Sequence, residues 1–342
     1  MRLLESKQYR EDLQKATQNI DLSMLDGKTV FITGGLGLIG STVVDVLICF
    51  GRTTVYVGAR DYQQFKERFG GYDKIEFVQY DALTPLNLKI KPDYIIHSAG
   101  LSSPELYTSM PIETILSNFD GLHSLLEYSK ENEVNRLLYV SSSEVYGKKE
   151  LGTPFSEDTY GIVNIDDIRS SYAIAKKASE MLCRAYMSEQ SVETIIVRPG
   201  HIYGPSAKKT DRRISSDFAF KAAIGEKLEM KSAGLQKRSY CYSIDCAIQI
   251  LTALLKGEAG QAYNVGNDAV TTIREMAEIC ADVGNVELTV AKPTETELHN
   301  FNPMNNSALD NSKIKKLGYR DTFSVKEGLR HTVEILKEIA TI

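Results

Sequence analysis

Between residues 28 and 198, short apolar runs rich in β-branched residues alternate with stretches of helical periodicity. The apolar runs are residues 29–33, 54–58, 75–80, 94–98, 136–141 and 194–197. They are apolar throughout rather than at every second position, which is typical of parallel strands covered on both faces. Residues 38–50 and 121–130 place apolar side chains three or four positions apart, as helices do. This order of elements predicts an α/β fold with a doubly wound parallel sheet.

The second half of the chain follows a looser pattern. After Pro199 the sequence is rich in loops and short elements, and a last helix is expected at residues 325–339. We therefore predict a sheet domain at residues 27–198 and, at 199–342, mainly a smaller C-terminal substrate-binding lobe from which the chain returns to the sheet domain. Residues 1–26 are polar and of mixed charge, which predicts a helical extension outside the fold.

Composition narrows the class of protein. The 342 residues are 42% hydrophobic and 25% charged, as in a globular chain, and the net charge of −5 without a long basic run argues against a nucleic-acid partner. The five cysteines form no C-x-x-C pair, which argues against a zinc or other metal site and favours a reducing compartment. No apolar run approaches the ~20 residues that span a bilayer, and no secretion signal is visible. A cytoplasmic protein without a membrane partner is expected.

A glycine-rich loop follows the first predicted strand. Residues 33–40 read Thr-Gly-Gly-Leu-Gly-Leu-Ile-Gly and contain a G-x-G-x-x-G pattern between a strand and a helix. In this context glycines let backbone N–H groups approach a pyrophosphate, and the helix directs its positive end at the same anion. The pattern predicts a Rossmann-type dinucleotide-binding domain, with the cofactor held by Gly34, Gly37, Leu38, Ile39 and Gly40.

The end of the second strand bears on which cofactor is bound. NAD sites usually place a carboxylate there to bind the ribose hydroxyls, but this position is Gly58. Arg60 could pair with the 2′-phosphate of NADP+, or Asp61 could bind the ribose and leave Arg60 as a solvated charge. Asp81, after the third strand, can accept the adenine amino group, and Ala99 is assigned to the same site. The expected cofactor is NAD+, with NADP+ as the alternative.

A Y-x-x-x-K pair at Tyr172 and Lys176 lies on a predicted helix, where residues four apart are neighbours. A lysine ammonium beside a phenol lowers the pKa of the tyrosine from about 10, so that Tyr172 can exchange a proton with a substrate hydroxyl while hydride leaves the same carbon. Behind a glycine-rich loop, this pair predicts an enzyme that oxidises an alcohol with a nicotinamide cofactor. Both residues are also assigned to the cofactor site.

From Gly27 to the C-terminus the chain resembles the extended short-chain dehydrogenase/reductases, which act on nucleotide-sugars. Residues 139–147 resemble the strand end that carries the catalytic Ser or Thr of the family, and this resemblance assigns that role to Ser142. Residues 197–205 match the segment after the sixth strand. Residues 238–245 match the nucleotide-diphosphate segment, which implies that Arg238 binds phosphate. The resemblance also implies a homodimer formed through two long helices.

Within that group the chain resembles the UDP-glucuronate decarboxylases. Residues 102–107 are similar to their loop after the fourth strand, residues 142–144 to their Thr-Ser-Glu, residues 156–172 to the segment before the catalytic tyrosine, and residues 212–218 to a substrate-lobe stretch. The resemblance implies that Ser102, Tyr107, Ser143 and Arg213 contact substrate and that Glu144 is catalytic. The chain departs from the family at residues 165–167, at residues 173–175 and at Gly58.

Three reactions and one non-enzymatic role fit these residues. A 4,6-dehydratase normally has an aspartic acid where this chain has Ser143, and a serine donates a proton poorly, so Glu144 favours decarboxylation over dehydration. A 4-epimerase needs only Ser142, Tyr172 and Lys176 and stays an alternative. In a further alternative Glu144 is a loop carboxylate without a catalytic role. A cofactor-binding sensor or scaffold without activity is the remote alternative, and the complete set of Ser142, Tyr172 and Lys176 argues against it.

Overall fold

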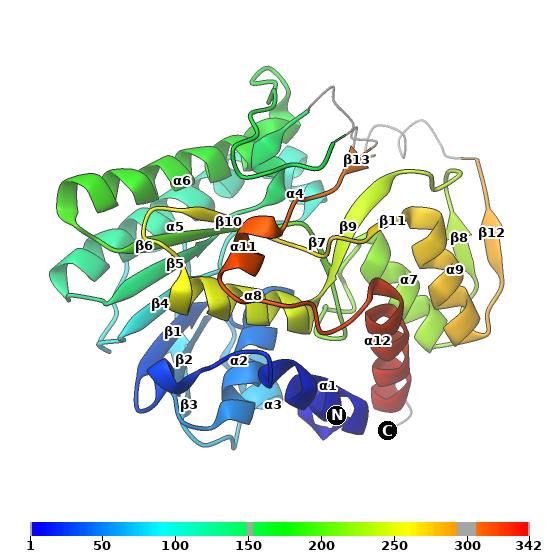
Figure 1. Cartoon of the computed structure of the whole chain (residues 1–342), viewed down its shortest axis with the longest axis horizontal. Coiled ribbons are helices and arrows are strands. Elements are labelled where there is room, and N and C mark those ends of the chain that lie inside the picture. The colour runs from blue at the N-terminus through cyan, green and yellow to red at the C-terminus, as the bar shows by residue number, and fades with distance from the viewer. Residues whose placement is uncertain (1, 149–152, 293–305, 341–342) are drawn as a thin grey trace.

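The computed structural model describes the chain except residues 1, 149–152, 293–305 and 341–342. Its centre is a seven-stranded parallel sheet with the strand order β10-β6-β5-β4-β1-β2-β3 (Figure 1). The strands are β1 (Thr29–Thr33), β2 (Thr54–Ala59), β3 (Ile75–Gln79), β4 (Tyr94–His97), β5 (Arg136–Val140), β6 (Thr194–Pro199) and β10 (Ala262–Val265). The predicted strands are therefore confirmed to within a few residues, and the sheet gains a seventh strand from the second half of the chain.

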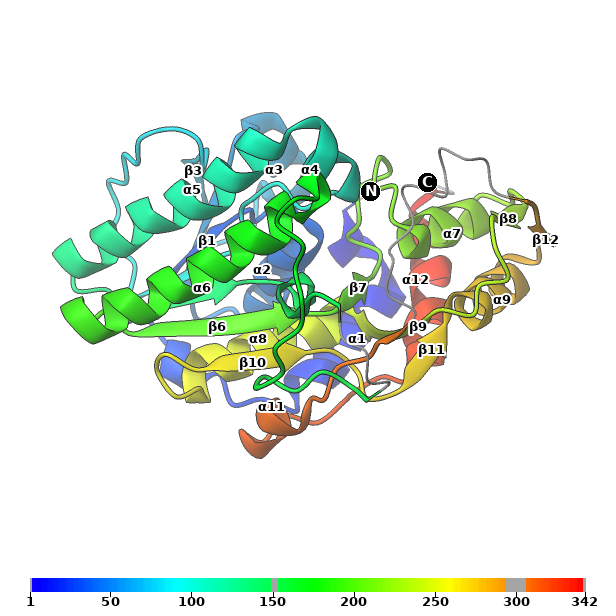
Figure 2. The same ribbon diagram turned by 90° about the horizontal axis from the view of Figure 1, so that it is seen from above.

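Helices cover both faces of this sheet (Figure 2). One face is packed against α2 (Leu38–Phe50), α3 (Tyr62–Phe69) and α8 (Ser243–Lys256), and the other against α5 (Pro111–Glu131) and α6 (Ser171–Gln190). Strands buried on both faces need apolar side chains at every position, which is why their sequences do not alternate. The predicted α/β fold of the Rossmann type is confirmed.

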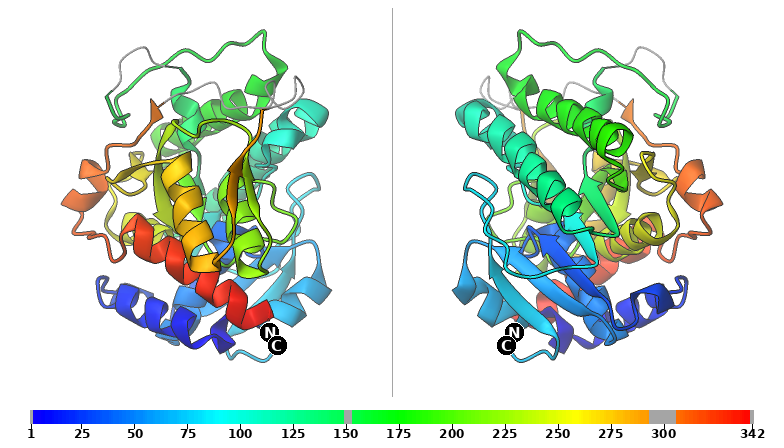
Figure 3. Two further views of the ribbon diagram at one scale, coloured as in Figure 1. Left: turned by 90° about the vertical axis from the view of Figure 1, so that its right-hand side faces the viewer. Right: turned by 90° about the vertical axis from the view of Figure 1, so that its left-hand side faces the viewer.

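The lobe consists of two small sheets and the helices packed on them (Figure 3). One sheet holds β11 (Val270–Thr272), β9 (Lys237–Tyr242) and β13 (Asn306–Ser307), with β7 (His201–Tyr203) also paired to β9. The other pairs β12 (Leu288–Val290) with β8 (Leu228–Met230). The helices are α7 (Ile214–Ala223), α9 (Ile273–Gly284) and α12 (Val325–Ala340), while α4 (Pro104–Ser109) lies on the sheet-domain side of the cleft.

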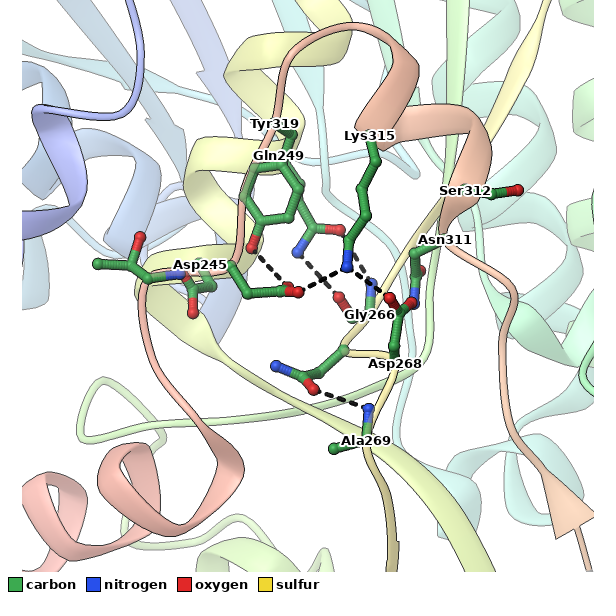
Figure 4. Close-up of polar contacts among 12 residues, drawn as sticks. Asp245, Gln249, Gly266, Asp268, Ala269, Asn311, Ser312, Lys315 and Tyr319 are labelled. Atoms are coloured by element: carbon green, nitrogen blue, oxygen red, sulfur yellow. Dashed lines mark hydrogen bonds and ion pairs between the residues drawn. The ribbon is translucent and has the colours of Figure 1, made fainter.

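The chain returns from the lobe to the sheet domain through α8, β10 and α11 (Ser312–Lys316). Figure 4 shows the polar contacts that hold this return together. Gln249 on α8 exchanges two hydrogen bonds of 3.0 Å with the backbone of Gly266, just after β10. Lys315 on α11 forms ion pairs with Asp268 and, at 2.7 Å, with Asp321. These contacts join three segments that are far apart in the sequence.

The N-terminal segment differs from the expectation of an extension outside the fold. It does form a helix, α1 (Lys7–Thr17), but Tyr9, Leu13 and Ala16 on this helix are fully buried. The helix packs against α2, α8 and α12. The Tyr9 hydroxyl donates a 2.7 Å hydrogen bond to Asp45 on α2, and Asp12 pairs with His331 on α12 at 2.9 Å. The polar residues that suggested a solvated appendage are in part the groups that dock this helix.

Candidate active site

A cleft of about 1130 Å³ lies between the sheet domain and the lobe. It is lined by the loops that follow β1 to β5 on one side and by residues 199–240 on the other. β1 is flanked by β2 and β4, so the chain crosses from one side of the sheet to the other at this point. In open α/β sheets, ligands bind at such a switch point, outside the carboxyl ends of the strands.

The glycine-rich loop forms one wall of the cleft, and Gly34, Gly37, Leu38, Ile39 and Gly40 all line it. Gly34 has φ +66°, and a Cβ at this position would lie 2.8 Å from the backbone of Ser98. A Cβ on Gly40 would lie 2.5 Å from the carbonyl oxygen of Gly34. This close packing brings the first turn of α2 to the cleft with its N–H groups available to an anion, so the loop fits the pyrophosphate of a dinucleotide.

Gly58, Arg60 and Asp61, at the end of β2 and just after it, also line the cleft. A Cβ on Gly58 would lie 2.8 Å from the ring of Phe31, so a carboxylate-bearing side chain does not fit at this position without a shift. Asp61 caps α3, where its two oxygens accept hydrogen bonds of 2.9 Å from the backbone and side-chain nitrogens of Gln64. Arg60 is exposed at the edge of the cleft. The guanidinium of Arg60 is thus more available to a cofactor than the carboxylate of Asp61.

Asp81 and Ala99, which the sequence assigned to the cofactor site, also line the cleft. One oxygen of Asp81 accepts a 3.0 Å hydrogen bond from the backbone of Leu83, which holds the carboxylate in place. The backbone N–H of Ala99 lies 3.3 Å from the hydroxyl of Thr33 at the end of β1.

Tyr172 and Lys176 lie together on the first turns of α6, and both are buried and line the cleft. The Lys176 ammonium donates a 2.7 Å hydrogen bond to the carbonyl oxygen of Val140 and lies 5.6 Å from the centre of the Tyr172 ring. Burial raises the pKa of Tyr172 to about 12, although a hydrogen bond with Ser142 acts to lower it. Burial lowers the pKa of Lys176 to about 7. The expected lowering of the tyrosine pKa does not occur in the protein alone, because desolvation dominates.

Residues 142–144 follow β5 and enter a short 3-10 helix, Ser143–Tyr146. The Ser142 hydroxyl accepts a 3.2 Å hydrogen bond from the backbone N–H of Glu144, and all three residues of the tripeptide line the cleft. The Glu144 carboxylate lies 3.6 Å from the guanidinium of Arg169, a residue to which the sequence assigned no role. Glu144 thus faces the cleft beside a cation.

Tyr107 on α4 stacks on the catalytic candidate Tyr172, with ring centres 4.5 Å apart and planes inclined by 5°. Its hydroxyl donates a 2.9 Å hydrogen bond to the backbone carbonyl of Ser102, and its own carbonyl accepts one of 2.9 Å from Ser171. The guanidinium of Arg169 lies 5.8 Å from the centre of the Tyr107 ring. Ser102 and Tyr107, which the sequence named as substrate contacts, therefore hold the candidate catalytic residue Tyr172 in place.

The lobe contributes two arginines to the cleft, Arg213 and Arg238. Arg213 is partly exposed and paired with Asp211, whose two oxygens lie 3.0 Å from its Nε. Arg238 is buried and donates a 2.9 Å hydrogen bond to the backbone of Lys237, and burial lowers its pKa. His201 lies in the same wall, where burial and the two arginines lower its pKa to about 3 and so keep the imidazole neutral. These two cations suit a diphosphate.

Two further observations concern metals and membranes. Among the residues that the structure describes, no group of three or more His, Cys, Asp or Glu side chains is placed to hold a metal ion. No helix in the described ranges is both long enough and apolar enough to cross a membrane.

A parallel sheet with a glycine-rich loop at its switch point, and a Tyr–Lys pair that lines the same cleft, are the features of the extended short-chain dehydrogenase/reductases. Residues 30–266 match the model of the NAD dependent epimerase/dehydratase family, and the chain belongs to this family. The resemblance stated from the sequence is thereby confirmed.

Relatives and solved structures agree with this assignment. UDP-glucuronic acid decarboxylase 6 of Arabidopsis thaliana is 32% identical over 306 residues, which are 88% of this chain and 86% of that protein. UDP-glucose 4-epimerase from Thermotoga maritima, solved with UDP-glucose, has a TM-score of 0.79 at 23% identity and covers 91% of this chain and 99% of its own. A double mutant of the dTDP-glucose 4,6-dehydratase DesIV from Streptomyces venezuelae, solved with NAD, has a TM-score of 0.77 at 24% identity and covers 90% of this chain and 97% of its own. The two solved structures share the fold.

Proposed function

We propose that the chain decarboxylates UDP-glucuronate by transient oxidation at C4, with an NAD-type cofactor bound at the glycine-rich loop. The observation that carries this proposal is the tripeptide 142–144, which places Glu144 in the cleft that also holds Tyr172 and Lys176. A dehydratase needs an acid where this chain has Ser143, whereas a decarboxylase does not. The similarity to UDP-glucuronic acid decarboxylases supports the same assignment.

The reaction begins with Tyr172, which takes the proton of the C4 hydroxyl. A nicotinamide cofactor, which Gly34, Gly37 and Gly40 of the glycine-rich loop would hold, would supply hydride exchange with C4 without being consumed. Lys176 keeps positive charge near the phenolate, and Ser142 donates a hydrogen bond to the C4 oxygen. Tyr107 holds the ring of Tyr172 in a fixed plane. The chain thus supplies the base, its orientation and the charge that stabilises it.

Once C4 is a ketone, the carboxylate on C5 belongs to a β-keto acid. Carbon dioxide leaves from C5 as the C5–carboxyl bond breaks, and its electron pair forms an enolate whose charge lies on the C4 oxygen. Ser142 and Tyr172 donate hydrogen bonds to that oxygen. Glu144, held beside Arg169, assists protonation at C5 or orders the water that does so. Tyr172 finally returns its proton to the C4 oxygen.

The decisive experiment incubates the protein separately with UDP-glucuronate, UDP-glucose, UDP-galactose and dTDP-glucose and identifies products by mass. UDP-glucuronate should lose the mass of carbon dioxide without a net accumulation of reduced cofactor. Glu144→Gln should slow this loss more than it slows C4 oxidation. Glu105→Gln is a matched control, because Glu105 also lines the cleft but lies on α4, outside the tripeptide.

Other products would identify another reaction. A UDP-hexose inverted at C4 would make the chain a 4-epimerase, and a neutral hexose that loses the mass of water would make it a 4,6-dehydratase. Cofactor binding without turnover of any of the four sugars would make it a sensor or scaffold. Any of these results, with UDP-glucuronate left intact, rules out the decarboxylase.

We propose NAD+ as the cofactor, supported by the family and by the glycine-rich loop. NADP+ is the competing candidate. The observation that favours it is that Arg60 is available in the cleft, whereas the neighbouring Asp61 carboxylate caps α3. Titration of the protein with each dinucleotide by calorimetry distinguishes the two, because a site built for a 2′-phosphate binds NADP+ more tightly.

We also propose a cytoplasmic homodimer. The observation that supports a dimer is the exposure of Ile112, Ile115 and Leu116 on α5 and of Met181 on α6, since these two long helices lie side by side. All five cysteines are free thiols, which supports a reducing compartment. Light scattering coupled to size exclusion should give twice the mass of the chain, and Ile112→Glu should lower it.

A further inference from the structure

The ammonium of Lys176, the lysine of the Tyr–Lys pair, lies over the face of an aromatic ring, that of Tyr139. The Lys176 ammonium is 4.6 Å from the centre of the Tyr139 ring, which is closer than its 5.6 Å distance from the ring of Tyr172. Tyr139 belongs to β5 and is fully buried. On the neighbouring strand β4, His97 stacks on the same ring, with centres 5.8 Å apart and planes inclined by 23°.

This environment decides the charge of Lys176. The side chain is buried, and its ammonium donates a 2.7 Å hydrogen bond to the carbonyl oxygen of Val140. Removal from water disfavours the ammonium form, and the charge of Glu180 on the same helix opposes that effect. A ring face is negative at its centre and attracts a cation at this distance, most strongly where water is excluded.

The titratable groups around Lys176 come from three elements. His97 on β4 stays neutral because burial lowers its pKa to about 3, so it does not repel the ammonium. Tyr139 on β5 stays a neutral phenol because burial raises its pKa. Tyr172, Glu180 and Cys183 lie on α6 itself, and of these only Glu180, whose pKa is lowered by its hydrogen bonds despite burial, carries charge at neutral pH. The Val140 carbonyl and the aromatic face of Tyr139 are therefore uncharged groups that favour the ammonium.

We propose that Tyr139 is a positioning residue for the reaction, and that its ring face holds the Lys176 ammonium in place and keeps it charged during turnover. The proposal rests on the proposed function in one respect, namely that Tyr172 needs a charged Lys176 beside it. It goes further by assigning part of the stabilisation of that charge to Tyr139 on β5. A ring that only fills space would have no such effect on the lysine.

The test compares Tyr139→Phe, which keeps the ring, with Tyr139→Leu, which removes it. The ¹⁵N chemical shift of the Lys176 ammonium, assigned by its loss in Lys176→Met, is followed against pH in the protein without substrate. We expect Tyr139→Phe to titrate like the wild type and Tyr139→Leu to lower the midpoint by about 0.4 to 1.5 pH units, as expected for loss of a cation–π contact. An unchanged or raised midpoint in Tyr139→Leu overturns the proposal, because a space-filling ring whose loss admits water would raise it.

Turnover supplies the second measurement. Activity needs the ammonium, so it falls as pH rises through the pKa of Lys176, and Tyr139→Leu should move this alkaline limb of kcat to lower pH by the same amount. If Tyr139→Leu does not fold, ring-fluorinated phenylalanines at position 139 keep the size of the ring and weaken its face stepwise. The alkaline limb of kcat and the midpoint of the ¹⁵N titration should then move to lower pH with each added fluorine. Equal pH values across the series overturn the proposal.

The two hypotheses fail separately. If no nucleotide-sugar is converted by the wild type, the proposed function is wrong, but the ¹⁵N titration still tests the contact between Tyr139 and Lys176. If the wild type is active and the titration of Tyr139→Leu matches it, the proposed function stands and the role of Tyr139 is rejected.

Discussion

Substitution of one partner in the buried ion pair between Arg198 and Glu180 should strongly lower the free energy of unfolding. Arg198, on β6, and Glu180, on α6, are 8% and 3% exposed, so neither charge is screened by water. The guanidinium donates two hydrogen bonds to the carboxylate, of 2.9 Å and 2.7 Å, and the Ser141 hydroxyl donates a third of 2.7 Å. Removal of one partner of such a pair leaves an uncompensated buried charge.

We predict that Arg198→Leu lowers the free energy of unfolding by about 3–5 kcal/mol, the usual cost of breaking a buried pair from one side. The double variant with Glu180→Leu should recover part of this loss, because it removes the stranded carboxylate as well. Arg184→Ala is the matched control: its guanidinium lies 3.5 Å from the same carboxylate, but the side chain is 38% exposed. For such an exposed pair the expected cost is about 0–1 kcal/mol.

Urea denaturation followed by circular dichroism at neutral pH measures all four proteins under one condition. The cost of Arg198→Leu should also shrink at pH 5, because burial raises the pKa of a Glu180 that has lost its partner and the carboxyl then becomes neutral. The reasoning is refuted if Arg198→Leu costs no more than Arg184→Ala, or if the double variant is less stable than Arg198→Leu.

Three further predictions concern other parts of the chain. Tyr172→Phe should lower kcat at least about 100-fold, as loss of a positioned acid/base does, while the Kd of the cofactor stays nearly constant, and equal activity would reject the assignment. Arg60→Ala should weaken NADP+ binding about 10- to 100-fold and NAD+ binding far less if the guanidinium binds a 2′-phosphate, and unchanged discrimination in calorimetry would return Arg60 to a solvated charge. His331→Gln should destabilise the protein more at pH 6 than at pH 9. The hydrogen bond and charge interaction with Asp12 raise the pKa of His331 in the folded state. The stability that His331 contributes is therefore present below its unfolded pKa and is lost as pH rises through its folded pKa. Thermal melts at the two pH values check this, and an equal loss at both would show that the imidazole acts without its charge.

The features that follow from local rules were predictable from the sequence. Continuous apolar runs locate the parallel strands, and the glycines at 34, 37 and 40 stand between a strand and a helix, where a tight turn needs them. Tyr172 and Lys176 face the same side because residues four apart do so on any helix. Each of these inferences depends on fewer than about a dozen consecutive residues and on backbone geometry that hardly changes between proteins.

Other features depend on residues that only the folded chain brings together. The sequence marks residues 1–26 as polar, and it does not show that Asp12 meets His331, 319 residues away. It also does not show that Tyr107 stacks on Tyr172 or that Tyr139 lies beneath Lys176. The pKa values follow the same division: the spacing of Tyr172 and Lys176 predicts a lowered tyrosine pKa, yet burial raises it to about 12. Spacing along the chain determines which side chains share a helix face. The exclusion of water from those side chains depends on strands and helices that are distant in the sequence, so only the tertiary structure decides it.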